Sequence, residues 1–326
     1  PTRRGVRDRE PGGAPMTLRI GVVGAGGFGR ALAVASARNS QDVTLWSREA
    51  RDLGEGVRST TDIGLLRDCE LIFVAVPARH AVSAAEQLGE IVDGRHLIVH
   101  VSRGLIGGEL ETLTQVIRRK TVCRRIGALA GPLVADALAE GLPSGAILGT
   151  GFPELTSMVR EAIGGSGLRI YDTKDVVGVE LASATVGFLT VILGYAREMG
   201  AAPGTLAVVA TRGMVEMSRV GYTLGADVET FMGLAGLGDL IAAVADYGRP
   251  ELRVGRALAQ GSDVRSAIGE IGAYVEGFEV ARHLIEHARR HGLETPISST
   301  FVAVSEGRMS QNDAIQALME RRVGTE

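Results

Sequence analysis

Short apolar runs alternate with amphipathic stretches along the first half of the chain. The apolar runs have the length of buried strands and are bounded by glycine, proline or polar residues, so we predict strands at 18–24, 42–46, 70–76, 95–102, 126–130 and 144–149. Apolar residues at helical spacing between these runs predict helices at 28–39, 79–90 and 108–119. Such alternation is typical of a parallel, doubly wound sheet with helices on both faces.

The pattern changes after residue 170. The segment 175–199 has no internal proline and keeps its apolar periodicity, which predicts one long helix. Helical patterns then recur at 203–223, 227–232, 236–247, 252–260, 263–270, 277–291, 297–306 and 310–321. The predicted fold class is therefore α/β, with an N-terminal doubly wound Rossmann domain followed by an all-α C-terminal domain.

Composition narrows the class of protein. The chain has 326 residues, of which 45% are hydrophobic and 22% charged, and its net charge of −3 gives no basic field for nucleic acid. We find no apolar run of membrane-spanning length, so we expect no membrane association. Cys69 and Cys123 lack metal-ligand spacing, so we expect reduced thiols, a cytoplasmic location and no metal site.

A glycine-rich turn joins the first predicted strand to the first predicted helix. Gly24, Gly26, Gly27, Phe28 and Gly29 make up this turn, together with Ala25. Glycines in that context permit a tight turn and a close approach of the backbone, while the helix N-terminus favours negative charge. We expect these five residues to hold the pyrophosphate of a dinucleotide.

The end of the second predicted strand bears on which dinucleotide binds. NAD-selective sites usually have an acidic residue here for the ribose 2′-hydroxyl, whereas this chain has Ser47 and Arg48. Arg48 can pair with a 2′-phosphate or stack on adenine, although Glu49 could serve the ribose instead. The cofactor is therefore expected to be NADP or NAD, with Ser47 and Arg48 at the adenosine ribose.

These patterns divide the chain into three parts. Residues 1–15 are charged and contain glycine and proline, so we expect a disordered or added N-terminal segment. Residues 16–174 are expected to form the NAD(P)-binding Rossmann domain, and residues 175–326 a helical domain for substrate binding and dimerisation.

Several motifs together resemble the NAD(P)-dependent glycerol-3-phosphate dehydrogenase family, from about residue 20 to about residue 318. The matching stretches are Gly24 to Gly29, Trp46-Ser47-Arg48, Val76-Pro77, Ser102 to Leu105, Gly131-Pro132, Glu140 to Pro143, Thr211-Arg212-Gly213, Glu216 to Arg219, Phe231 to Leu240 and Val275-Glu276-Gly277. The run from Phe231 to Leu240 is the most specific of them.

The resemblance implies a Rossmann domain with a helical domain of the 6-phosphogluconate dehydrogenase type and a small-molecule substrate. The all-helical second domain suggests a homodimer formed through its helices. The resemblance also implies reversible hydride transfer between the nicotinamide and C2 of dihydroxyacetone phosphate or glycerol 3-phosphate. Pro77, Arg103, Ala135 and Glu276 are then expected on the nicotinamide side. Catalysis is expected to depend on Asp239, with Arg103 polarising a carbonyl.

The substrate half of the site departs from the family pattern. The family's proton-transferring lysine falls on Val186, and the asparagine beside it falls on Gly187. The phosphate-binding Arg-Asn pair falls on Pro250 and Glu251. A substrate-contacting threonine falls on Leu133, and a second lysine is replaced by Arg103, which cannot give up a proton near neutral pH. Valine cannot transfer a proton, and a glutamate in place of the phosphate-binding pair should repel a phosphate.

Three interpretations follow. The chain is an NAD(P)-dependent oxidoreductase acting on a carbonyl or imine carbon of an altered substrate that is unphosphorylated or cationic. In that case the polar groups near the nicotinamide would be Glu251, Glu198, Asp239 and Tyr195. Alternatively, it is a genuine glycerol-3-phosphate dehydrogenase in which Arg103, Arg249 or Arg253 compensates, or a non-catalytic NAD(P)-binding sensor or partner subunit.

Overall fold

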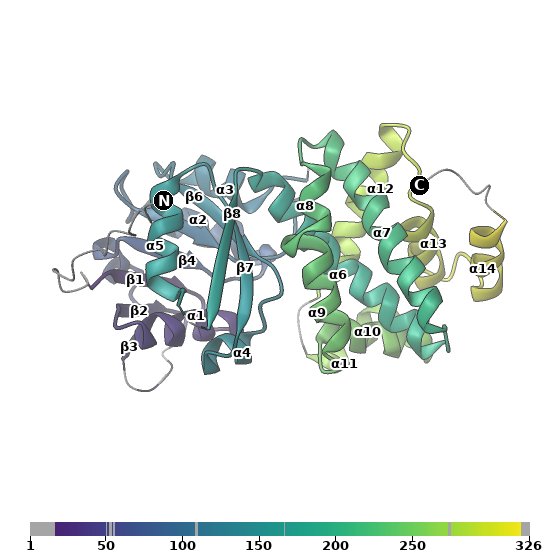
Figure 1. Cartoon of the computed structure of the whole chain (residues 1–326), viewed down its shortest axis with the longest axis horizontal. Coiled ribbons are helices and arrows are strands. Elements are labelled where there is room, and N and C mark those ends of the chain that lie inside the picture. Colours follow the sequence, from purple (N-terminus) through teal and green to yellow (C-terminus); the bar gives the residue numbers. More distant parts are fainter. Residues whose placement is uncertain are drawn as a thin grey trace, which may run out of the picture.

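The chain folds into two lobes, one built on a sheet and one made of helices (Figure 1). The computed structural model describes residues 17–49, 51, 54, 56–107, 110–165, 167–272 and 275–320. The expected disordered segment 1–15 lies outside the described residues, as do residues 321–326 at the other end. The predicted fold class, a Rossmann domain followed by a helical domain, is confirmed.

A single eight-stranded sheet forms the first lobe, in the order β3-β2-β1-β4-β5-β6-β7-β8. The strands are β1 (Arg19–Val23), β2 (Asp42–Trp46), β3 (Val57–Thr60), β4 (Leu71–Val74), β5 (Leu97–His100), β6 (Ile126–Ala130), β7 (Ser144–Gly149) and β8 (Leu168–Thr173). β1 lies between β2 and β4, with Val22 opposite Leu45 on one side and Phe73 on the other. Because β1 is central, the turn that follows it opens at the middle of the carboxyl edge of the sheet.

Helices cover both faces of this sheet. The elements are α1 (Gly27–Arg38), η1 (Ile63–Asp68), α2 (Ala78–Gly89), α3 (Leu113–Lys120), α4 (Ala135–Glu140) and α5 (Pro153–Ile163). Side chains of α1 and α5 pack with Val22 on one face, and side chains of α2 and α3 pack with Val23 on the other. Successive residues of a strand point to opposite faces, so one apolar strand serves both cores.

The second lobe contains only helices among its described residues. They are α6 (Val176–Glu198), α7 (Pro203–Thr223), α8 (Val228–Met232), the π-helical turn η2 (Leu234–Gly238), α9 (Asp239–Ala245), α10 (Pro250–Ala259), α11 (Val264–Ile271), α12 (Gly277–Arg290), α13 (Pro296–Ser305) and α14 (Gln311–Met319). The positions agree closely with the predicted helices, because most of these segments are amphipathic and α6 is a long apolar stretch without proline.

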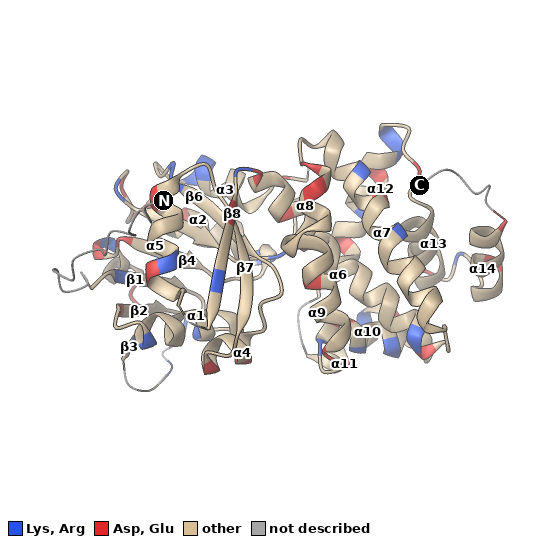
Figure 2. Ribbon diagram, in the orientation of Figure 1, with Lys and Arg blue, Asp and Glu red and all other residues tan. Residues whose placement is uncertain are grey.

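Helix α6 is the core of the helical lobe and also packs against β6 and β7. By length and composition alone, Val176–Glu198 and Val228–Ala245 could each cross a membrane, which corrects the expectation that no apolar run is long enough. In this fold 89% of the apolar window of α6 is buried, as is usual for a core helix, and 33% of the second window is buried. Positive and negative side chains are interspersed over both lobes (Figure 2).

The Rossmann domain differs from the prediction in both its strands and its helices. β3 and β8 were not predicted as strands, and β7 runs antiparallel to β6, so the sheet is not wholly parallel. Helices α4 and α5 were also missed. Helix α3 starts at Leu113 rather than 108, because Thr112 and Gln115 form a reciprocal capping box that fixes the first turn.

Candidate active site

A pocket lies where the carboxyl edge of the sheet meets the helical lobe. Its walls come from the glycine-rich turn, from the segments after β4 and β5, and from α6, α10 and α12. The lining residues are Gly26, Gly27, Phe28, Ala75, Val76, Pro77, Val101, Ser102, Arg103, Gly104, Ala184, Gly187, Glu251, Glu276, Gly277 and Val280. Ligands bind at this edge in doubly wound folds, and here both lobes contribute to it.

The glycine-rich turn has the geometry of a dinucleotide cradle. Gly24 has φ +108°, and a Cβ there would lie 2.5 Å from the Ala75 carbonyl oxygen. A Cβ on Gly29 would fall onto the Gly24 carbonyl oxygen. Gly26 and Gly27 instead face open space, and the N-terminus of α1 has no side-chain cap. The backbone N–H groups of that first turn are therefore available to an anion such as a pyrophosphate, and this part of the site fits NAD(P).

The end of β2 carries the predicted ribose-binding residues. Ser47 is buried and its hydroxyl donates to the Glu49 carbonyl oxygen at 2.5 Å, while Arg48 is exposed. The pKa of His80 is lowered mainly by burial and, to a smaller extent, by the positive charges of Arg79 and Arg48. The charges of Arg48, after β2, and of Arg79, in α2, thus both act on His80 at the start of α2. Sequence reasoning missed Arg79, because the spatial proximity of β2 and α2 is not visible in the linear order.

Asp239 is held between two arginines at the base of the helical wall. It follows the η2 turn, is fully buried, and pairs with Arg103 at 2.9 Å and with Arg249 at 3.4 Å. Burial raises the pKa of Asp239 to about 6, against the opposing effect of Arg103. Arg249 also pairs with Glu251 at 3.4 Å, so the four side chains form one network. The structure brings Arg103 and Asp239 together.

The α6 residues that line the pocket, Ala184 and Gly187, have no proton-transferring side chain. Val186 is fully buried in the helical core and is not among the lining residues. The Oε1 atom of Glu251 lies 4.0 Å from the position that a Cβ on Gly187 would take. The carboxylate of Glu251 therefore faces the space in which the family pattern has an asparagine.

Glu276 links the helical lobe to the sheet lobe. Its Oε1 accepts a hydrogen bond of 2.5 Å from the backbone N–H of Ala78, in the first turn of α2. Burial raises the pKa of Glu276 to about 7, although the backbone N–H groups of Ala78 and Arg79 act in the opposite direction. This carboxyl lines the same pocket as the glycine-rich turn.

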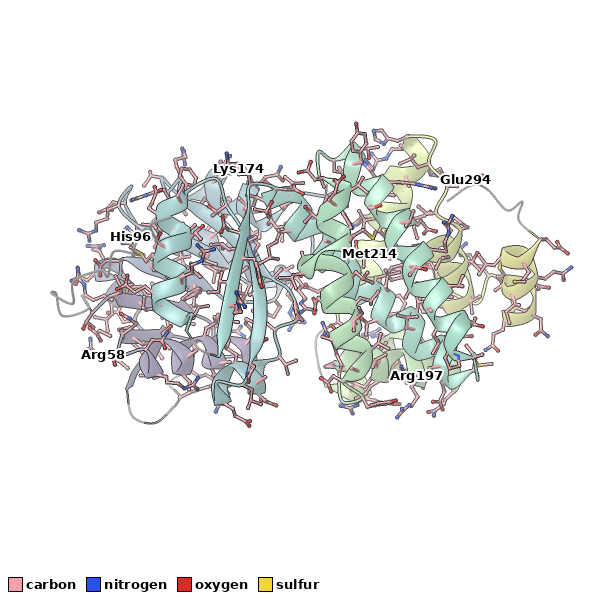
Figure 3. All side chains as sticks on the ribbon, viewed as in Figure 1. Arg58, His96, Lys174, Arg197, Met214 and Glu294 are labelled. Atoms are coloured by element: carbon pink, nitrogen blue, oxygen red, sulfur yellow. The ribbon has the colours of Figure 1, made fainter. Side chains whose placement is uncertain are left out.

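Other candidates lie away from the pocket. Ala135 begins α4 and packs on the core beneath α1, so it is not among the lining residues. Tyr195 packs edge-on against Phe301, and Glu198 accepts a hydrogen bond from Gln260. Neither residue lines the pocket, contrary to the first interpretation. Lys174, one of the two lysines of the chain, is exposed after β8 and does not line the pocket either (Figure 3).

Comparison with known proteins identifies the family. The family profile described as NAD-dependent glycerol-3-phosphate dehydrogenase C-terminus matches residues 175–316. The corresponding N-terminus profile matches residues 19–62 and 51–154.

Individual relatives agree with these profiles. The glycerol-3-phosphate dehydrogenase [NAD(P)+] of Azorhizobium caulinodans is 34% identical over 93% of this chain and 97% of its own length. That of Dechloromonas aromatica is 32% identical over 93% and 98%. The crystal structure of glycerol-3-phosphate dehydrogenase from Coxiella burnetii superposes with a TM-score of 0.86 and 27% identity, covering 94% of this chain and all of that one. With its cradle, its buried Asp239 and these matches over both lobes, the chain belongs to the NAD-dependent glycerol-3-phosphate dehydrogenase family, whose members are NAD(P)-dependent oxidoreductases acting on CH–OH groups.

Proposed function

We propose that this protein transfers hydride between NAD(P) and the carbinol or carbonyl carbon of a small substrate that is not a phosphate ester. The observation that carries the proposal is the α6 face of the pocket. Val186 is fully buried and Glu251 faces the space beside Gly187. A dianionic phosphate would have to approach this carboxylate, which is unfavourable at low dielectric.

The charged residues of the pocket can polarise a substrate carbonyl, but they do not include a lysine that could donate a proton to it. Arg103 lines the pocket with its side chain 29% exposed, so its guanidinium can hydrogen-bond to a substrate oxygen. Asp239 lies behind it, fully buried, and orients it through the 2.9 Å ion pair. Reduced NAD(P) supplies the hydride, and the proton comes from solvent because arginine stays protonated.

A second candidate is glycerol-3-phosphate dehydrogenase itself, with arginines replacing the lost contacts. The relatives' names favour it, and so does Arg249, which directly precedes Pro250 at the position of the family's phosphate-binding arginine. Against it, both Arg249 contacts are to carboxylates, Asp239 and Glu251, at 3.4 Å each. These ion pairs would have to open for a phosphate to bind.

The choice between NADP and NAD, the assembly and the location remain predictions. Arg48 supports NADP, because it is an exposed cation directly after β2, where the adenosine ribose of a dinucleotide is expected. A homodimer is supported by exposed apolar side chains on the helical lobe, namely Val208, Tyr222, Val228, Met232 and Ile241. A cytoplasmic location is supported by Cys69 and Cys123, which are buried free thiols.

A substrate panel combined with a reversion variant tests the proposal. Unphosphorylated ketones, imines and phosphorylated ketoses are assayed for NAD(P)H oxidation by the wild type and by the Val186→Lys, Pro250→Arg, Glu251→Asn triple variant. We expect the wild type to reduce an unphosphorylated compound and the variant to gain activity on dihydroxyacetone phosphate. Rates with dihydroxyacetone phosphate that already match those of ordinary family enzymes would support the second candidate. Tight cofactor binding without any turnover would indicate a sensor.

A further inference from the structure

The position of Glu251 is fixed by unusually close packing of two helices. A Cβ on Gly255 of α10 would lie 2.6 Å from the Tyr195 backbone nitrogen of α6. Conversely, a Cβ on Gly194 of α6 would lie 2.5 Å from the Leu252 carbonyl oxygen of α10. Only glycine at both positions allows this approach, so the first turn of α10 is held against α6 and places Glu251 over Gly187.

The two oxygens of the Glu251 carboxylate have different surroundings. Oε2 pairs with Arg249 Nε at 3.4 Å, and Arg249 is only 10% exposed and is not among the residues that line the pocket. Oε1 is the atom directed toward Gly187, and both residues line the pocket. Glu251 also lies in the first turn of α10, where the helix dipole favours a negative charge. One carboxylate oxygen is therefore presented to a ligand.

The charges around this oxygen favour a cation. The charged residues lining the pocket are Arg103, Glu251 and Glu276, and Arg103 is already paired with the buried Asp239. The chain has lysine only at Lys120 and Lys174, and neither lines the pocket. The Glu251 carboxylate is about four-fifths buried. Such a carboxylate binds a positively charged group with N–H donors much more strongly than it binds a neutral hydroxyl group.

We propose that Glu251 selects a substrate with a primary ammonium group near the reacting carbon, that is, a small amino alcohol and the corresponding amino ketone. This inference rests on the proposed function and names its substrate class. The ammonium donates to Glu251 Oε1, while the substrate oxygen accepts from Arg103. Hydride and a solvent proton add across the C=O bond to give the alcohol, so the C–N bond and the ammonium are unchanged. Glu251 determines specificity, and Arg249 positions it.

A matched series of three alcohols tests this proposal by binding. The series is 3-amino-1,2-propanediol, glycerol and glycerol 3-phosphate, which differ only in one substituent. Each is titrated calorimetrically into enzyme saturated with NAD(P)H, where an alcohol cannot react, so binding is measured whether or not the protein turns over. We expect the amine to bind at least about tenfold more tightly than glycerol, and glycerol 3-phosphate most weakly.

Glu251→Gln keeps the shape and removes the charge. It should reduce the preference for the amine over glycerol to within about threefold. The exposed Glu270→Gln on α11 makes the same charge change and should leave the preference intact. The amine preference of the wild type should also fall as pH rises through the pKa of the ligand amine, and this dependence should vanish in Glu251→Gln. Thermal melting of both variants establishes that they are folded.

The outcomes separate the inference from the proposed function. Equal binding of amine and glycerol by the wild type, or an amine preference that survives Glu251→Gln, would overturn the inference. Oxidation of glycerol-type substrates with NAD(P)+ would then still support the proposed function. Conversely, a Glu251-dependent amine preference without turnover of any alcohol would support the binding site and refute the proposed hydride transfer.

Discussion

Glu276 gives the molecule a pH-dependent stability that one substitution should remove. Its carboxyl bridges the two lobes by accepting a hydrogen bond from the Ala78 backbone N–H in the first turn of α2, and burial raises its pKa from 4.5 to about 7. Because the folded-state pKa lies above the unfolded value, the stabilising contribution is complete below about pH 4.5. It is lost as pH rises through about 7.

The magnitude follows from the size of that rise. At about 1.4 kcal/mol per pKa unit, a rise from 4.5 to about 7 corresponds to at most about 3.5 kcal/mol, of which the range from pH 4 to pH 8 samples about 3 kcal/mol. Glu276→Gln keeps an acceptor oxygen for Ala78 but cannot ionise. The free energy of unfolding of the variant, relative to the wild type, should therefore increase by up to about 3 kcal/mol between pH 4 and pH 8.

Urea unfolding of the cofactor-free protein across this pH range measures the effect. The exposed Glu286→Gln on the same helix, α12, is the matched control and should run parallel to the wild type. Parallel curves for Glu276→Gln and the wild type would refute the reasoning, because they would mean that this carboxyl has the same pKa in the folded and unfolded states.

Three further predictions concern the cofactor, the carbonyl site and the helix packing. Arg48→Ala should raise the KM for NADPH about tenfold, since a charged hydrogen bond to a 2′-phosphate contributes about 1.5–3 kcal/mol. The KM for NADH should change less than about twofold. Equal effects on the two KM values would argue that Arg48 does not contact the 2′-phosphate. Arg103→Ala should lower kcat/KM about 10²–10³-fold in steady-state assays, whereas an unchanged value would exclude Arg103 from the reaction. Gly255→Ala should cost about 1–3 kcal/mol in chemical unfolding, because the added Cβ would lie 2.6 Å from the Tyr195 backbone nitrogen. Gly269→Ala on α11, where a Cβ meets nothing within 4 Å, is its control and should not destabilise; equal costs would contradict the close packing.

Periodicity predicted the fold where the local pattern was strong and failed where long-range pairing decided. The helix that became α6 was predicted almost to its ends, because Asp175 caps it and apolar residues continue to Gly194. β8 was missed because strands were predicted from continuous apolar runs, whereas here the buried Leu168 and Ile170 alternate with the exposed Arg169 and Tyr171. The antiparallel direction of β7 depends on pairing with β6, which is not visible in either strand alone.

The candidate site draws on residues that the family pattern pointed to, but its connections were not visible in the sequence. Aligning the family motifs assigned Val186 and Glu251 to the substrate side. Glu251 lines the pocket beside Gly187, whereas Val186 is buried in the helical core and is not among the lining residues. The chain order did not reveal that Arg249 joins Glu251 to Asp239, because that link depends on how α10 docks on α6. Tyr195 and Glu198 were misplaced for a related reason, since they lie farther along α6 than the pocket extends.

We propose that this family member acts on a substrate without a phosphate. The most direct test is the ratio of kcat/KM for dihydroxyacetone to kcat/KM for dihydroxyacetone phosphate, measured with NADPH and the wild-type protein. The arrangement of Val186, Gly187 and Glu251 predicts a ratio above one. A preference for the phosphate ester of tenfold or more would contradict this expectation and would mean that the arginines beside Asp239 supply the phosphate contacts.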